Sequence, residues 1–410
     1  MNLFVLIFGY LRARPLNTLL NIILLSLGLA MITILLLFSR QLKEKIADNT
    51  QGIDLVVGAK GSPLQLILCN VFHIDFPTGN IKLQEADRLA KHRLVKSAIP
   101  LALGDSYQGY RIVGTTRAYA ELYAAELADG TWWKEDREVT VGSTAARLLK
   151  LKPGDTFASA HGLGTEGHAH EEHPFVVTGV LKPTYSALDN LILTNVATIW
   201  LVHEHEEVLV KPDSLQASRL VPTSFASDST REITSILIRY RNPIAAIQLP
   251  RYINSQTNMQ AASPSFEAAR LLSIVGVGIE ALTGFAYVLI MISALSIFIA
   301  LYNSLKERKY DLAIMRSMGA SRGKLFWATQ LEGVVLTVSG SVLGVALGHG
   351  VLYLFTVLVS ESQTAGMNAG TFYREELYLL AGSVMLGMVC SLIPSLQAYR
   401  TDIHKVLAQG

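Results

Sequence analysis

The sequence is poor in charge and in cysteine. Only 17% of its 410 residues are charged and half are hydrophobic, which disfavours a purely soluble protein. A net charge of +2, without a dense Lys/Arg run, argues against a nucleic-acid partner. Two cysteines, Cys69 and Cys390, are too few for a disulfide framework, and Cys390 lies within an apolar run. We therefore expect a membrane protein without redox chemistry.

The motifs of several enzyme classes are missing as well. No G-x-x-x-x-G-K-[ST] occurs, and the nearest string, GASRGKL, lacks both the spacing and the hydroxyl of a phosphate-binding loop. The sequence contains neither G-x-S-x-G nor H-E-x-x-H. We therefore predict that the chain is not an enzyme.

Four apolar runs predict membrane-spanning helices. Leu16 to Ser39 holds 24 residues without a charge, enough at 1.5 Å per residue to cross a hydrocarbon core of about 30 Å. The predicted spans are 16–39, 281–302, 329–359 and 377–399. Residues 1–15 contain the apolar string NLFVLIFGYL, which ends at Arg12 and predicts a helix in the lipid headgroup layer on the cytoplasmic side.

The basic residues predict the orientation. Residues 303–328 carry six basic and two acidic side chains, whereas 360–376 carry one basic and three acidic. Since short basic loops stay on the cytoplasmic side, 303–328 and the tail 400–410 are predicted to be cytoplasmic and 360–376 extracytoplasmic. Residues 40–280 then form a large extracytoplasmic domain.

The texture of that domain predicts an α+β fold. Short β-branched runs such as FVVTGVL and ITSILIRY alternate with segments of helical spacing such as LQEADRLAKH. Residues 264–280 are apolar at helical spacing and run into the second span without a proline, which predicts a rigid stalk. The predicted fold is thus four transmembrane helices with an α+β extracytoplasmic domain between helices 1 and 2.

The segment "ERKYDLAIMRSMGASRGKLF" (307–326) predicts a short helix between the second and third spans. Tyr310, Ile314 and Met318 recur every four residues and form an apolar stripe, and Gly319 and Ser321 supply a helix stop and an N-cap. Such a helix fits either a groove on another protein or the surface of anionic lipid, and both interpretations stand.

This segment closely resembles the signature of FtsX-like permeases of ABC transporters, the group that includes MacB. The matching residues are Asp311, Ile314, Met315, Arg316, Met318, Gly319, Ala320 and Ser321. "REVTVGSTAARLLKLKPGDTF", "FVVTGVLKP" and the order of the spans resemble the same family, and so does the segment 54–81. The resemblance implies that the segment, with Tyr310, couples to a separate ATPase subunit that binds ATP and Mg²⁺.

From this resemblance we expect a homodimeric permease subunit in a bacterial inner membrane. It would couple ATP hydrolysis to motion of the extracytoplasmic domain, for export or extraction of a substrate that the sequence does not identify. The alternative is an FtsX-like signalling regulator of an extracytoplasmic enzyme or sensor, and a membrane-anchored metalloenzyme is a third class. Membrane lipid and an extracytoplasmic adaptor or substrate protein are further expected partners.

Small and polar residues interrupt the third span. Gly340, Gly344 and Gly348 form a small-xxx-small face that suits either a homodimer contact or packing within the chain. His349 beside them is a packing residue or a proton relay. Glu332 borders the cytoplasmic end of the span, where we expect it to be solvated.

Histidines gather in one part of the extracytoplasmic domain. The candidate metal ligands are His161, His168, His170, His173, His203 and His205, with carboxylates interspersed. Imidazoles at this spacing suit Zn²⁺ or a similar ion, whereas a solvated loop that binds no metal explains the same composition.

Overall fold

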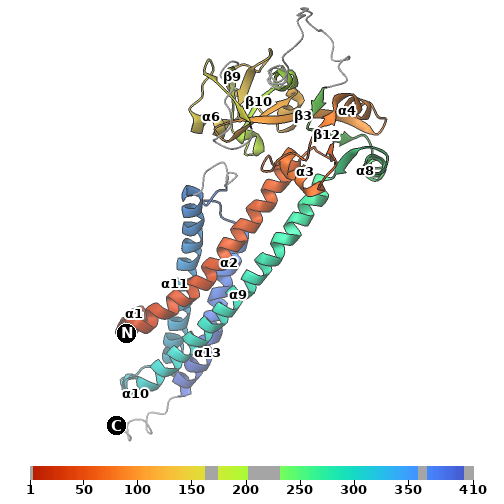
Figure 1. The fold of residues 1–410 in the computed structure, drawn as a ribbon. Coiled ribbons are helices and arrows are strands. Elements are labelled where there is room, and N and C mark those ends of the chain that lie inside the picture. The colour runs from red at the N-terminus through yellow and green to blue at the C-terminus, as the bar shows by residue number, and fades with distance from the viewer. Residues whose placement is uncertain (1–2, 162–173, 202–230, 359–366, 401–410) are drawn as a thin grey trace, which may run out of the picture. The chain divides into compact units, whose positions relative to one another are not determined.

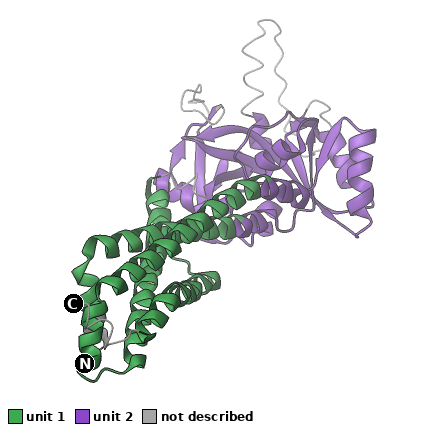
Figure 2. Ribbon diagram, turned by 90° about the horizontal axis from the view of Figure 1, so that it is seen from below, with its two compact units in different colours: residues 1–42, 274–360, 367–410 green, residues 43–273, 361–366 purple. Residues whose placement is uncertain are grey.

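The computed structural model describes residues 3–161, 174–201, 231–358 and 367–400. The chain divides into two compact units (Figure 2). The first, here called the helical unit, comprises residues 1–42, 274–360 and 367–410. The second, the α/β unit, comprises residues 43–273 and 361–366.

Long apolar helices build the helical unit. They are α2 (Pro15–Thr50), α9 (Pro264–Glu307), α11 (Arg322–Leu358) and α13 (Arg374–Arg400), with the shorter α1 (Leu3–Ala13) and α10 (Lys309–Ser317) (Figure 1). The most apolar windows of the four long helices have mean hydropathies of 2.7, 2.4, 1.8 and 2.0. These four helices are long and apolar enough to cross a membrane, and α2 and α9 also supply residues to the α/β unit.

Glycines let the helices of this unit approach closely. A Cβ atom at Gly340, Gly344 or Gly348 would lie 2.7 to 3.0 Å from side-chain atoms of α2, and Gly344 would meet Leu29 at 2.8 Å. At Gly333 an added Cβ would lie 2.6 Å from Ser391 of α13. The glycine face of α11 is thus occupied by α2 of the same chain.

Polar side chains pair inside the helical unit. Asn21 accepts a hydrogen bond from Ser296 at 2.7 Å, and Ser383 donates to Ser341 at 2.9 Å. Large apolar side chains such as Phe285, 69% exposed, face outward. This distribution suits a hydrocarbon solvent, in which unpaired polar groups are costly.

A mixed sheet forms the centre of the α/β unit. Its strands are β1 (Leu55–Ala59), β3 (Val95–Tyr107), β4 (Tyr110–Thr115), β5 (Leu127–Gly130), β6 (Glu138–Val141), β7 (Thr156–Phe157), β8 (Ala160–His161), β9 (Phe175–Leu181), β10 (Leu191–Asn195), β12 (Ser235–Tyr240) and β13 (Met259–Ala262). The order is β13-β1-β12-β3-β4-β10-β6-β9-β5, with β7 on β9 and β8 on β3. β10 with β4 and β6 with β9 pair in parallel, while β2 (Ile81–Lys82) and β11 (Glu232–Ile233) form a separate pair.

Each face of this sheet carries its own hydrophobic core. Leu55 and Val57 of β1 point into one core, and Val56 points into the other, because successive side chains of a strand alternate. α4 (Leu83–Ala90), α6 (Ser143–Leu149) and α8 (Ala245–Gln256) cover the first core. α3 (Pro63–Asn70), α5 (Arg117–Leu122) and the 3₁₀ turn η1 (Ala187–Asn190) cover the second. The predicted combination of four long helices with a mixed α/β domain between the first and second is confirmed.

Candidate functional site

The helix α10, between α9 and α11, has one buried and one exposed face. Leu312 and Ala313 are 5% and 0% exposed. Leu312 joins an apolar cluster whose other buried members come from α9, α11 and α13: Leu305, Leu325 and Ala398. This packing fixes α10 to the rest of the helical unit.

The opposite face presents three large apolar side chains to the outside. Tyr310, Ile314 and Met318 are 50%, 37% and 81% exposed. We call these three residues the apolar ridge. The acidic Asp311 stands in the first turn of α10 and the basic Arg316 in the last, as the helix dipole favours. Met315 instead is partly buried against the apolar cluster, so it serves the support of the helix.

The sequence Gly319-Ala320-Ser321 makes the turn from α10 into α11. Ala320 N–H donates to Met315 O and Gly319 N–H to Arg316 O, both at 3.0 Å, which is the Schellman pattern of helix endings. Gly319 has φ +99°, a conformation that a residue with a Cβ adopts only with strain. The Ser321 hydroxyl then accepts from Lys324 N–H at 3.3 Å as the N-cap of α11. Gly319 and Ser321 of this motif therefore each have a reason in the backbone geometry: the first ends α10 and the second caps α11.

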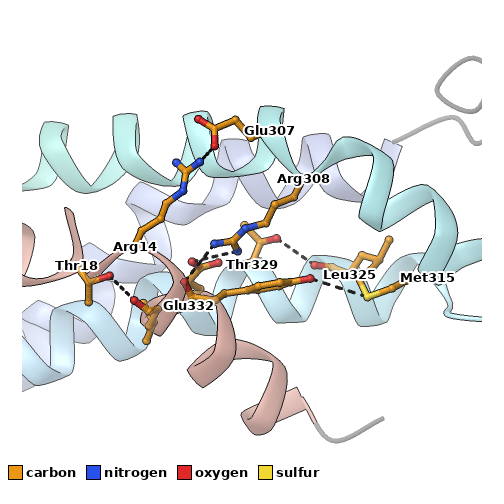
Figure 3. Close-up of polar contacts among 10 residues, drawn as sticks. Arg14, Thr18, Glu307, Arg308, Met315, Leu325, Thr329 and Glu332 are labelled. Carbon is orange, nitrogen blue, oxygen red and sulfur yellow. Dashed lines mark hydrogen bonds and ion pairs between the residues drawn. The ribbon is translucent and has the colours of Figure 1, made fainter. Parts of the chain in front are cut away.

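A charged cluster lies at the other end of α10, at the junction with α9 (Figure 3). The Arg308 guanidinium carbon lies 3.8 Å from the centre of the Tyr10 ring, and Arg308 Nη2 donates to Tyr10 O at 3.3 Å. Arg308 Nη1 also pairs with Glu332 Oε1 of α11 at 3.6 Å. The two charged side chains are 13% and 10% exposed. We call Tyr10, Arg308 and Glu332 the arginine cluster.

The prediction that Glu332 is solvated is therefore wrong. Its carboxylate is buried, because α1 and α9 cover this end of α11 and bring Arg308 to it. A second ion pair nearby, Arg14 with Glu307, is more open, with side chains 30% and 58% exposed (Figure 3).

No helical periodicity in the sequence pointed to the arginine cluster. The available signal was physical: a carboxylate inside an apolar helix needs a partner, and "ERK" at 307–309 supplied a nearby basic group. The choice of Arg308 over Lys306 or Lys309 depends on the contact of α9 with α1 and α11, which only the fold provides.

His349 is also paired at the opposite end of α11. Its Nδ1 lies 2.6 Å from Ala369 O and its Nε2 lies 2.8 Å from Glu376 Oε2. Because a carbonyl oxygen only accepts, Nδ1 is the donor to Ala369 O, and Nε2 faces the Glu376 carboxylate at hydrogen-bond distance. Glu376 also accepts from Tyr373 N–H at 2.9 Å, so this group joins α11 to the start of α13.

Of the six candidate metal ligands, the structure describes one, and only its backbone. His161 pairs with Asp105 in the β8–β3 ladder. The others, His168, His170, His173, His203 and His205, lie outside the described residues. Within the described part of the chain, no group of three His, Cys, Asp or Glu side chains could hold a metal ion.

The segment 54–81 builds a buried polar network in the α/β unit. Arg111 Nη2 donates to Asp75 O at 2.7 Å and Nη1 to Cys69 O at 3.3 Å. His73 Nε2 lies 2.8 Å from the Tyr119 hydroxyl, and its Nδ1 is buried without a hydrogen-bond partner. Burial, with a smaller contribution from Arg111, lowers the pKa of His73 to about 3. These contacts fix the loop after α3, which is a structural role.

Two family models match the chain. The MacB-like periplasmic core domain matches residues 18–255, and the FtsX-like permease C-terminal model matches residues 283–403. The first of these covers more than half of the chain, and the second covers α10 and the Gly319-Ala320-Ser321 turn that follows it.

Individual relatives are distant. The chain is 20% identical over 333 residues to the macrolide export ATP-binding/permease protein MacB of Escherichia coli, covering 78% of this chain and 47% of MacB. It is 26% identical over 140 residues to the ABC transporter permease YtrF of Bacillus subtilis (strain 168), covering 34% of this chain and 30% of YtrF. The chain thus spans less than half the length of these relatives.

Among solved structures, the chain is similar to the periplasmic region of MacB from Actinobacillus actinomycetemcomitans. The TM-score is 0.34 at 15% identity, over 55% of this chain and 97% of that structure.

Proposed function

Since the chain belongs to the FtsX-like, MacB-type family of ABC transporter permeases, we propose that it is a permease subunit whose α10 docks on a separate ATPase subunit. ATP hydrolysis in that partner would move α10 and, through the long helices, the α/β unit. The substrate would be exported or extracted on the side of the α/β unit.

The observation that carries this proposal is the apolar ridge on a fixed helix. Three large apolar side chains stay exposed while the other face of α10 packs into the apolar cluster. A partner groove would receive these side chains at spacings of four residues, which is the helix-in-groove mode of recognition. The buried face keeps α10 from yielding when it is pushed.

The architecture of the long helices favours the transmission of force and does not favour a path for a solute between them. α9 is one helix of 44 residues, and its last residue, Glu307, is followed at once by Arg308 and α10. Polar side chains described in the helical unit bond to one another, as Asn21 does with Ser296, or to carbonyls of their own helix, as Thr337 does with Gly333 O. A helix of this length is a stiff element that carries a displacement of α10 along its axis.

We place α10 on the cytoplasmic side of a bacterial inner membrane and propose a homodimer with two ATPase subunits. The six basic residues of 303–328 support the orientation. Since α2 occupies the glycine face of α11, another surface of the helical unit would form the dimer contact.

The docking proposal is tested with the double variant Ile314→Asp/Met318→Asp. Two carboxylates in an apolar interface would be desolvated without partners, so we expect co-purification with the ATPase subunit to fall by at least about tenfold. Lys324→Asp is the matched control, because it changes the local charge by the same two units on an exposed residue outside the ridge. Normal complex formation by the double variant would contradict the docking proposal.

We also propose that the histidines of 161–205 bind a divalent transition-metal ion linked to the cargo. Their composition and spacing support this proposal. Zn²⁺ binding to the full chain should weaken when His168, His170 and His173 are replaced together by Gln. Equal binding by both proteins would remove the metal link and leave the permease proposal intact.

A further inference from the structure

Arg308 occupies the single position between α9 and α10. Its backbone, at φ −92° and ψ 9°, leaves the helical conformation. Hydrogen bonds nevertheless continue across it, from Arg308 N–H to Ser304 O at 3.1 Å and from Leu312 N–H to Arg308 O at 3.0 Å. A push on α10 therefore reaches α9 through this residue.

The side chain of Arg308 connects this junction to two further helices. Its guanidinium covers the Tyr10 ring of α1, donates to the Tyr10 carbonyl and pairs with Glu332 of α11. A guanidinium can make these contacts together because it is planar, permanently charged and carries five N–H donors. One side chain thus joins α1, α11 and the α9–α10 junction, all within the helical unit.

Burial makes this connection stiff. Both charged side chains are close to nine-tenths buried, and in such surroundings a charge that loses its partner is strongly disfavoured. A cavity of about 20 Å³ beside them is lined by Tyr10, Ser304, Thr329 and both charged residues, and it has room for about one water molecule. Arg308 and Glu332 therefore cannot separate far without leaving a charge unpaired.

We propose that Arg308 is a positioning residue that transmits displacement of α10 to α1 and α11 through the arginine cluster. This inference rests on the proposed function, but it concerns a step after docking. The apolar ridge receives the force, and the arginine cluster distributes it so that the helices move together. α1, which packs against α11, then belongs to the path of transmission.

The test uses Arg308→Gln in the full chain assembled with its ATPase subunit in lipid nanodiscs. We expect co-purification and ATP hydrolysis to remain, whereas the ATP-dependent change in hydrogen exchange of the α/β unit falls by about tenfold, the scale of a typical coupling between sites. The control Glu307→Gln removes the more exposed ion pair with Arg14 and should leave this change within about twofold of the wild type.

A charge swap keeps the inference falsifiable if Arg308→Gln folds poorly. The double variant Arg308→Glu/Glu332→Arg restores the ion pair with α11 but not the donation to the Tyr10 carbonyl, because a carboxylate only accepts, so it should regain only part of the ATP-dependent change that each single variant loses. Tyr10→Leu should lose part of the change, because it removes the ring beneath the guanidinium.

A measurement without the ATPase separates this inference from the docking proposal. In the isolated full chain, Arg308→Gln should accelerate amide exchange in both α1 and α10 and leave α13 unchanged. Unchanged exchange in α1, or a wild-type ATP-dependent change in an intact complex, would overturn the inference. Normal docking of the Ile314→Asp/Met318→Asp variant would contradict the docking proposal and would leave the exchange result in the isolated chain unaffected.

Discussion

The two units of this chain distribute apolar and polar side chains in opposite ways, each suited to a different solvent. In the α/β unit, apolar side chains such as Val56 and Leu237 fill the interior. In the helical unit, apolar side chains face outward and polar pairs such as Asn21 with Ser296 lie inside. The difference shows that helix packing here depends on small residues and hydrogen bonds, since hydrocarbon offers no hydrophobic drive between helices.

Both units also bury ionisable side chains, but the examples below differ in whether every polar atom has a partner. The α/β unit buries His73 with one ring nitrogen unpartnered, whereas the helical unit gives Glu332 an arginine. Buried polar groups are strong specifiers of structure because an unpaired one is costly. We therefore expect the largest difference in stability between the two units when a buried charged side chain loses its partner.

The largest effect is expected for Glu332→Leu. It leaves the buried Arg308 without its carboxylate, which costs about 3–5 kcal/mol of the free energy of unfolding. The double variant Arg308→Met/Glu332→Leu should recover most of this loss, since no unpaired charge remains. Denaturant unfolding in detergent, followed by circular dichroism, measures both.

Glu307→Leu is the control for that experiment. Its carboxylate is 58% exposed in the pair with Arg14, so its removal should cost less than about 1 kcal/mol. A loss in Glu307→Leu as large as that in Glu332→Leu would show that burial does not distinguish the two pairs.

A smaller effect is expected for Gly344→Val in the seam between α11 and α2. The first added carbon would already lie 2.8 Å from Leu29 Cβ, so the helices must separate, at a cost of about 1–3 kcal/mol. Gly350→Val tests the same helix where no atom lies within 4 Å of an added Cβ, and it should be close to neutral. Equal stability of both variants would mean that this seam does not stabilise the helical unit.

The smallest effect sharpens the view of the α/β unit. The pKa of His73 falls from its ordinary 6.5 to about 3 in the folded chain, so the unfolded chain binds the proton first as the pH falls. His73 therefore stabilises the fold above pH 6.5, and this contribution is lost as the pH falls towards 3. The first pH unit below the ordinary value should cost about 1 kcal/mol.

Hydrogen exchange of the sheet strands at several pH values measures this loss. His73→Asn should flatten the dependence, because Asn has no titrating group and tolerates the left-handed backbone that His73 adopts at φ 57°. The same slope in His73→Asn would assign the pH dependence to other groups.

Local patterns in the sequence predicted much of this molecule. The strand runs FVVTGVL and ITSILIRY lie in β9 and in β11 to β12, and the helical run LQEADRLAKH contains α4. The stripe Tyr310, Ile314 and Met318 is exposed on α10, and Gly319 and Ser321 end one helix and begin the next. Each of these features depends on residues within a few positions of one another.

Contacts between distant residues could not be predicted in the same way. Arg308 and Tyr10 are 298 positions apart, and His73 and Tyr119 are 46 apart. The sequence showed that Glu332 and His349 lie in apolar helices and need partners, but more than one residue of suitable chemistry could have paired with each. The sequence likewise did not determine which face of α11 packs against α2. In the structure, Gly344 lies against Leu29.

The sequence by itself determined the long apolar helices, the alternating strands, the exposed stripe of α10 and its glycine turn, because hydropathy and backbone preference act over short spans of chain. The tertiary structure alone decided that Arg308 joins α1 and α11, that Glu332 is buried and that the glycine face receives α2. These outcomes depend on which surfaces exclude solvent together, and that is a property of the folded chain.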